Sequence, residues 1–160
     1  MNVVIIGASG YSGAELASLV AKHPDFSLAG CYVSEQSLDK DKLLSELYPE
    51  HTGLLDTLLL PLTEKAFSVI EQQADYVCLC TDHKVSVELA PKFLALGKKV
   101  FDLSGGYRLA KTSDYDTYYG FEHPYAQWLE QAQYGLAEWY AQDIADAQLI
   151  AVPGCYPTAA

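Results

Sequence analysis

Arginine is almost missing from this sequence of 160 residues: nine of its ten basic residues are lysine, and Arg108 is the only arginine. Basic residues are also outnumbered by 21 acidic ones, which makes the formal net charge −11. Such a charge argues against nucleic-acid backbones and anionic membranes as partners, although it leaves room for a local cationic pocket. The composition therefore favours a small-molecule ligand.

Long apolar runs are missing as well, since no stretch approaches the roughly 20 residues of a membrane span. The first apolar residues already have the pattern of a strand, so no secretory leader is expected. Four cysteines show neither a metal-site spacing nor a redox C-x-x-C spacing; they are Cys31, Cys78, Cys80 and Cys155. We therefore expect a cytoplasmic protein with reduced thiols, no metal site and no membrane partner.

The beginning of the chain carries the first functional pattern. Four consecutive β-branched residues, Val3–Ile6, predict a buried parallel strand, because a strand covered on both faces need not alternate. Gly7, Gly10 and Gly13 follow, and then a helical pattern with the apolar residues Leu16, Leu19 and Val20 on one face. Strand, glycine turn and helix in this order predict a dinucleotide site, where a pyrophosphate approaches the backbone at the helix N-terminus. The alternative is a tight turn with no ligand.

Strands and helices alternate along the rest of the chain. The further predicted strands are 26–33, 52–62 (an edge strand, because of Pro61), 76–80, 99–102 and 148–152. The predicted helices are 42–48, 64–73 with Thr63 as N-cap, 84–96 closed by Gly97, 124–131 and 138–145. This alternation predicts the α/β class, with a doubly wound, mostly parallel Rossmann-type sheet and helices on both faces. Ligands of such sheets bind beyond the carboxyl ends of the strands, so we expect the strand ends to face one crevice.

The end of the second predicted strand bears on the cofactor. A residue about 20 positions beyond the glycines is expected to contact the adenosine ribose. The hydroxyls of Ser34 and Ser37, with Lys40 and Lys42 nearby, suit a 2′-phosphate and favour NADP. Glu35 argues for NAD unless it points into solvent.

Cys155 stands apart from the other cysteines. It follows a predicted buried strand and a Pro-Gly turn, and Pro157 suits the first turn of a new helix. A thiol at a helix N-terminus is a better nucleophile, because the helix favours the thiolate. We therefore predict that Cys155 is the catalytic nucleophile and that Cys31, Cys78 and Cys80 are structural.

Four motifs occur together and in order. They are G-A-S-G-Y-S-G at 7–13, F-D-L-S-G-G-Y-R at 101–108, Y-G-L-A-E at 134–138 and P-G-C-Y-P-T at 153–158. With them the chain resembles the N-acetyl-γ-glutamyl-phosphate reductases of arginine biosynthesis. Aspartate-semialdehyde dehydrogenases share the architecture but have Asn where this chain has Gly154.

The resemblance implies a reaction and a division of labour. Cys155 would attack the acyl phosphate and form a thioester, which NADPH reduces to the semialdehyde. Arg108 would hold a substrate carboxylate or phosphate, and Glu138 would orient a substrate amide. The expected cofactor contacts are Gly7, Ser9, Gly10, Tyr11, Ser12, Gly13, Ser34, Ser37, Thr81, His83, Ser86, Ser104 and Gly105.

The family's acid/base histidine belongs to a second domain that these residues do not contain. We therefore expect a dinucleotide-binding domain at 1–152 and, at 153–160, the start of an active-site helix that leads into that domain. The fragment is expected to bind cofactor only, and the full-length protein to be a homo-oligomer.

For two of these residues the alternative is a purely structural role. Arg108 would instead pair with Asp114 or Asp116 at the surface, and Glu138 would merely cap its helix. At the level of the whole chain, the alternatives are an aspartate-semialdehyde-type dehydrogenase and a non-catalytic NADP-binding module.

Overall fold

β1 (Asn2–Ile6) is an inner strand of the first of two units, Met1–Cys80 and Thr81–Ala160, into which the chain divides. The structure is a computed structural model that describes all residues from 1 to 160. The other elements of the first unit are α1 (Tyr11–Lys22), β2 (Ser27–Val33), α2 (Leu44–Leu47), the 3-10 helix η1 (Pro49–His51), β3 (Leu59–Pro61), α3 (Glu64–Gln73) and β4 (Tyr76–Leu79).

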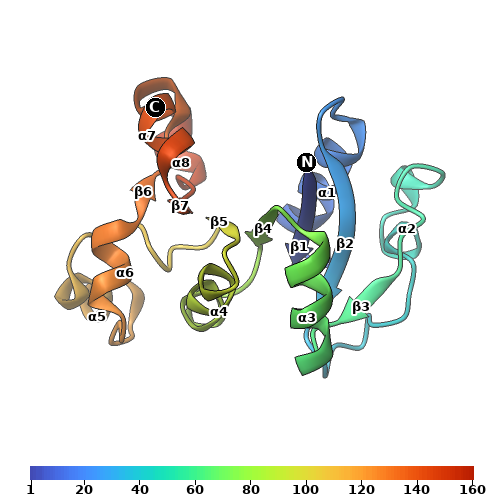
Figure 1. The fold of residues 1–160 in the computed structure, drawn as a ribbon, viewed down its shortest axis with the longest axis horizontal. Helices are drawn as coiled ribbons and strands as arrows, with labels where there is room; N and C mark the ends of the chain where they lie inside the picture. The colour runs from blue at the N-terminus through green and yellow to red at the C-terminus, as the bar shows by residue number, and fades with distance from the viewer. The chain divides into compact units, whose positions relative to one another are not determined.

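The first unit contains a parallel sheet with the strand order β3-β2-β1-β4. From β1 to β2 the chain crosses toward one edge of this sheet, and from β3 to β4 it crosses back toward the opposite edge. Because both crossovers are right-handed, α1 and α3 lie on opposite sides of the sheet, as Figure 1 shows. This arrangement confirms the predicted doubly wound α/β class.

The buried side of α1 differs from the prediction. Leu19 was expected on the apolar face, but it is 66% exposed. The buried residues of α1 are small: Gly13, Ala14, Ala17, Ser18 and Val20. Small side chains let the helix approach the sheet closely, which a periodicity of large apolar residues does not reveal.

The segment between β2 and α3 is less regular than predicted. Only Leu59–Pro61 of the expected strand 52–62 pairs with β2, and α2 is shorter than the expected helix 42–48. Pro49 starts η1 there, because its ring fits a first helical position. The expected N-cap is confirmed, since the Thr63 side chain accepts a hydrogen bond from the Ala66 N–H.

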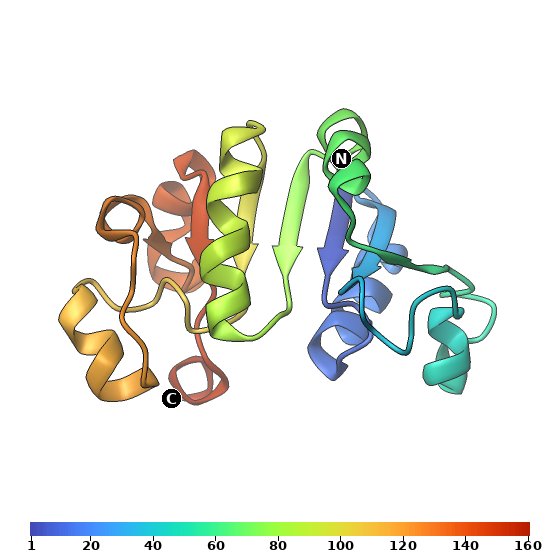
Figure 2. The same ribbon diagram turned by 90° about the horizontal axis from the view of Figure 1, so that it is seen from below.

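The strands of the second unit are parallel and lie in the order β5-β7-β6. Its elements are α4 (His83–Ala95), β5 (Lys99–Asp102), α5 (Thr112–Tyr119), α6 (Ala126–Gln131), β6 (Gln133–Tyr134), α7 (Ala137–Asp146), β7 (Leu149–Ala151) and α8 (Cys155–Ala159). Figure 2 shows α4 lying along β5. Gly97 closes α4 with a φ of +72°, as predicted. The short β6 and helix α5 were not predicted.

Aromatic side chains fill the region between β5 and β6. Tyr115 is fully buried and contacts the rings of Tyr119, Phe121 and His123, with centroids 4.6 to 5.5 Å apart. These rings form a packed core cluster in the second unit. No helix of the structure is both long and apolar enough to cross a membrane.

Candidate functional site

The glycine turn after β1 is held against the end of β2. Gly7 has a φ of +84°, a conformation that favours glycine. The N–H groups of Gly7 and Ala8 both donate to the Tyr32 carbonyl, at 2.8 and 3.1 Å. The turn is therefore placed beside the carboxyl end of the neighbouring strand, and Figure 2 shows the arrowheads of β1 and β2 at the same edge.

The other two glycines of the turn serve different purposes. A Cβ at Gly13 would overlap the Gly7 carbonyl oxygen and lie 2.7 Å from the Ala8 Cα, so the packing of helix on turn requires glycine there. A Cβ at Gly10 would meet only the Gly7 oxygen, at an ordinary 3.6 Å. The chain itself does not require glycine at this position, whereas close approach of a pyrophosphate does.

The first turn of α1 is open to an anion. Its N-cap, Gly10, offers no side-chain acceptor, and no acidic residue lies in that turn. The N–H groups of Tyr11, Ser12 and Gly13 have no acceptor within the chain. Unpaired N–H groups at the positive end of a helix fit the phosphates of a dinucleotide.

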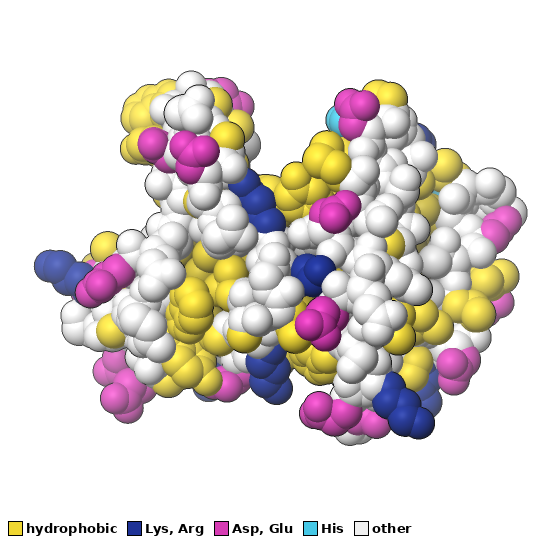
Figure 3. Space-filling model, viewed as in Figure 1, with side chains coloured by type: hydrophobic (Ala, Val, Ile, Leu, Met, Phe, Trp, Pro, Cys, Tyr) yellow, Lys and Arg dark blue, Asp and Glu magenta, His cyan; other side chains and the backbone are white.

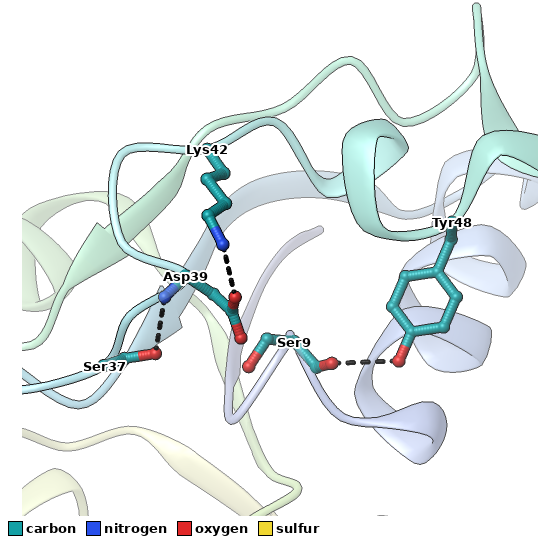
Figure 4. Close-up of polar contacts among 5 residues, drawn as sticks. All are labelled: Ser9, Ser37, Asp39, Lys42 and Tyr48. Carbon is teal, nitrogen blue, oxygen red and sulfur yellow. Dashed lines mark hydrogen bonds and ion pairs between the residues drawn. The ribbon is translucent and has the colours of Figure 1, made fainter.

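The loop after β2 has an ordered hydrogen-bond pattern. The Ser37 N–H donates to the Ser34 carbonyl at 3.0 Å, and the Ser37 hydroxyl accepts from the Asp39 N–H at 3.1 Å. Both expected lysines have partners: Lys42 Nζ lies 2.9 Å from Asp39 Oδ1, and Lys40 donates to the Glu35 carbonyl. Figure 4 shows the Asp39 carboxylate between Lys42 and Ser9.

A cavity of about 410 Å³ joins this loop to the glycine turn. It is lined by Ser9, Tyr11, Glu15, Asp39, Leu47, Tyr48 and Glu50. The Tyr48 hydroxyl donates to the Ser9 carbonyl at 2.9 Å, and the rings of Tyr48 and Tyr11 meet edge to face at 6.1 Å. Asp39 and Tyr48 were missed in the sequence, because only the folded loop brings them beside residue 9.

In the second unit, Ser86 is fully buried and shares a hydrogen bond of 2.8 Å with the Thr81 hydroxyl. It has no exposed surface for a cofactor in this conformation, and the expected contact stays a prediction. Thr81 itself is half-buried. Its contact with a cofactor remains a prediction.

Asp102 is a buried carboxyl at the end of β5. Its Oδ1 accepts from the Ser104 N–H at 3.0 Å, while Oδ2 has no hydrogen-bond partner. Burial raises the pKa of Asp102, and contacts with the Ser104 and Ser86 hydroxyls and the charge of Arg108 oppose this rise only in part. Asp102 therefore keeps its proton to a higher pH in the native protein than an exposed aspartate does.

This raised pKa predicts a pH dependence of stability. Between the ordinary value of 3.8 and the raised native pKa, the native protein holds a proton that the unfolded chain has lost. The free energy of unfolding should therefore fall as pH rises through this window. In Asp102→Asn that fall should be absent, as urea unfolding at a series of pH values would measure. An identical pH slope in both proteins would contradict the assignment.

The loop after β5 uses its glycines internally. The Gly105 N–H donates to His83 Nδ1 at 2.8 Å, and its expected contact with a ligand stays a prediction. A Cβ at Gly105 would overlap the Tyr119 ring, which explains the glycine without a ligand. Ser104 is buried, and its hydroxyl accepts from the Gly106 N–H at 2.9 Å. His83 and Ser104 thus order this loop, whatever they contact besides.

Arg108 links the ends of two strands. Its Nε donates to the Val152 carbonyl at 2.7 Å, and its Nη2 donates to the Leu103 carbonyl at 2.8 Å. No carboxylate lies within 4.0 Å, so the alternative of an ion pair with Asp114 or Asp116 is wrong. Both hydrogens of Nη1 and one of Nη2 remain, enough for a bidentate contact with an anion.

Cys155 lies beside this guanidinium. Arg108 Nη1 is 3.3 Å from where a Cβ of Gly154 would stand. A cavity of about 460 Å³ is lined by Arg108, Leu109, Tyr119, Tyr134, Gly154, Cys155, Tyr156 and Pro157. Cys155 is exposed and begins α8, in line with the predicted helix start. By contrast, burial raises the pKa of Cys31 and of Cys78 to about 12, which keeps both as inert thiols.

Glu138 is the expected site residue with the least structural support. It is exposed in the first turn of α7 and lines neither cavity. The N-cap of α7 is Leu136, without a side-chain hydrogen bond, so Glu138 is not that cap. Its contact with a substrate amide remains a prediction, as does the meeting of all strand ends at one crevice.

Known proteins resemble this chain over nearly its whole length. The chain is 61% identical over 159 residues to N-acetyl-gamma-glutamyl-phosphate reductase of Idiomarina loihiensis, covering 99% of this chain and 47% of that protein. It is 58% identical to the protein of the same name from Aeromonas hydrophila, covering 99% of this chain and 48% of that protein. The chain thus spans about half the length of these relatives.

Solved structures share the fold. Aspartate semialdehyde dehydrogenase II from Vibrio cholerae, complexed with ASA, matches with a TM-score of 0.64 and 20% identity over 98% of this chain and 42% of that chain. Residues 2–147 match the family model described as semialdehyde dehydrogenase, NAD binding domain. With nearly its whole length matched, the chain belongs to the semialdehyde dehydrogenase family, as an NAD-binding domain.

Proposed function

We propose that this chain is the cofactor-binding half of an NADPH-dependent N-acetyl-γ-glutamyl-phosphate reductase. The reaction converts N-acetyl-L-glutamyl 5-phosphate to N-acetyl-L-glutamate 5-semialdehyde and phosphate. The observation that carries the proposal is the exposed Cys155 in one cavity with Arg108, in a chain 61% identical to a protein of that name. We propose that the enzyme acts in the cytoplasm. Its partner is a small-molecule substrate rather than a nucleic acid or a membrane.

The residues of the second unit support a thioester mechanism. The Cys155 sulfur attacks the acyl carbon, the bond to the phosphate oxygen breaks, and phosphate leaves with the electron pair. Arg108, held by two backbone carbonyls, offers its remaining N–H groups to a carboxylate or phosphate of the substrate. NADPH supplies a hydride to the thioester carbon when bound. Cys155 is then released as the thiohemiacetal collapses to the semialdehyde.

The glycine turn supports the nucleotide side of the proposal. Gly7, Ser9, Gly10 and the open first turn of α1 would hold the pyrophosphate. The Ser34–Lys42 loop would hold the ribose and its 2′-phosphate, the group that distinguishes NADP from NAD.

We expect the 160-residue chain to bind NADPH without turning over acyl phosphate. The nucleotide contacts lie within the chain, whereas the acid/base histidine of the family belongs to a second domain. Titration followed by NADPH fluorescence, and an assay for NADPH consumption with N-acetylglutamyl phosphate, test the two parts. Steady-state turnover by the chain alone would contradict the division of labour. Reduction of aspartyl phosphate but not N-acetylglutamyl phosphate by a longer protein would favour the aspartate-semialdehyde alternative.

The second domain is proposed to follow residues 153–160 and to cover α7. None of the ten residues of α7 is buried, and Trp139 on it is 78% exposed. A helix of this length is marginal in water unless a face packs against something. Hydrophobic side chains gather on this part of the surface in Figure 3. The half of the relatives' length that this chain lacks is the proposed cover.

The fluorescence of Trp139 tests whether the second domain packs over α7. In a Trp128→Phe background Trp139 is the only tryptophan of the chain, which has two. Iodide should quench it strongly in the 160-residue chain and several-fold less in a protein that carries the second half. Equal quenching in both proteins would show that the second half leaves α7 uncovered.

A further inference from the structure

The cavity beside the glycine turn is lined by negative charge, which is unexpected for a site that binds a 2′-phosphate. Its charged lining residues are the carboxylates Glu15, Asp39 and Glu50, and no lysine or arginine lines it. A 2′-phosphate would add further negative charge to this site. Its binding therefore depends on a cation that lies near the cavity and is free to turn toward it.

Lys42 is that cation, and Asp39 holds it. Lys42 Nζ contacts Asp39 Oδ1 at 2.9 Å, and the two side chains are 42% and 34% exposed. A pair with this much solvent around it is weak, so a group with more negative charge can take Lys42 from Asp39. Lys40 is directed elsewhere, to the Glu35 carbonyl.

The backbone of Asp39 is held by a contact that does not involve Lys42. The Asp39 N–H donates to the Ser37 hydroxyl at 3.1 Å, so this part of the loop would keep its place if Lys42 moved. Oδ2 of Asp39 makes no hydrogen bond. Figure 4 shows the carboxylate directed toward Ser9, whose carbonyl Tyr48 holds on the far side of the same cavity.

From these contacts we infer that Asp39 sets the nucleotide preference of this site, as an internal competitor of the 2′-phosphate for Lys42. With an unphosphorylated nucleotide, Asp39 keeps Lys42 and accepts a hydrogen bond from the ribose 2′-hydroxyl. With NADPH, Lys42 leaves Asp39 for the phosphate, and the uncompensated carboxylate lowers the affinity. The inference rests on the proposed nucleotide-binding role of this unit.

The experiment compares Asp39→Asn and Lys42→Gln with the unaltered 160-residue chain. Dissociation constants for NADPH and NADH are measured by fluorescence titration, and those for adenosine 2′,5′-bisphosphate and AMP by calorimetry. Asp39→Asn should raise the ratio of NADPH to NADH affinity about tenfold, because one charge is removed beside a phosphate. Lys42→Gln should lower that ratio by a similar factor. The ratio of the affinity for adenosine 2′,5′-bisphosphate to the affinity for AMP should change in the same direction in each variant. Glu46→Gln, which removes a charge on α2 outside the cavity, should leave the ratio unchanged.

The outcomes separate the two proposals. If the unaltered chain binds neither nucleotide, the proposed nucleotide role fails, and this inference with it. If it binds NADPH and Asp39→Asn leaves the ratio unchanged, or shifts it no more than Glu46→Gln does, the role of Asp39 is wrong while the nucleotide role stands. A lower ratio in Asp39→Asn would also overturn the inference.

Discussion

Substituting Cys155→Ser in a full-length reductase that contains this chain is expected to lower kcat for acyl-phosphate reduction by at least about a thousandfold. A hydroxyl is a far weaker nucleophile than a thiolate, because a serine hydroxyl is hardly ionised at neutral pH whereas a cysteine thiol is partly ionised. NADPH affinity should stay the same, because the nucleotide contacts lie on other residues. Phosphate release and NADPH consumption, measured in parallel, check the first step and the whole reaction.

Cys80→Ser is the matched control for this result. Cys80 is half-buried and does not line the cavity of Cys155, so the same chemical change there should leave kcat within about twofold. If Cys155→Ser retained hydride transfer to N-acetylglutamyl phosphate, the thioester mechanism would have to be abandoned.

Gly13→Ala should lower the free energy of unfolding by about 3 kcal/mol and abolish NADPH binding. The added Cβ would lie 2.7 Å from the Ala8 Cα and overlap the Gly7 carbonyl oxygen. These are backbone atoms next to a buried strand, so α1 would have to move away from the turn. Urea unfolding and NADPH titration of the 160-residue chain measure both effects.

Gly10→Ala makes the contrast, because its new Cβ would meet nothing closer than 3.6 Å. Its φ of −80° is ordinary for alanine, so the free energy of unfolding should fall by no more than about 1 kcal/mol, the cost of a poorer N-cap. NADPH binding should nevertheless weaken clearly, because the methyl group occupies the space proposed for the pyrophosphate. A Gly10 variant that binds NADPH normally would show that the phosphates lie elsewhere.

The elements that could be predicted from sequence are those with strong local signals. Val3–Ile6 with the following glycines, Thr63 as N-cap and Gly97 after α4 all lie where expected, because each depends on residues close in the chain. β3 and β6 could not be delimited in this way. They are short edge strands of three and two residues, whose pairing is decided by the neighbouring strand rather than by their own pattern.

The same distinction between local and long-range signals applies to the site residues. Cys155 could be singled out because a turn, a helix start and a thiol are adjacent in the chain. For Gly105 and Ser86, by contrast, the hydrogen bonds to His83 and Thr81 exist only in the folded unit, so no local pattern indicates that these groups are paired inside the chain. Asp39 and Tyr48 escaped notice for the converse reason, since nothing local marks them as neighbours of Ser9.

The sequence by itself determined the α/β class, the glycine turn and the place of Cys155 at a helix start, because short-range rules of turns, caps and buried strands govern all three. Only the tertiary structure decided which polar groups remain available to ligands. Arg108 shows the reason: as the one arginine it was an obvious candidate, yet which of its N–H groups remain depends on the Leu103 and Val152 carbonyls. Hydrogen bonds between residues 44 positions apart are set by packing, which no local pattern encodes.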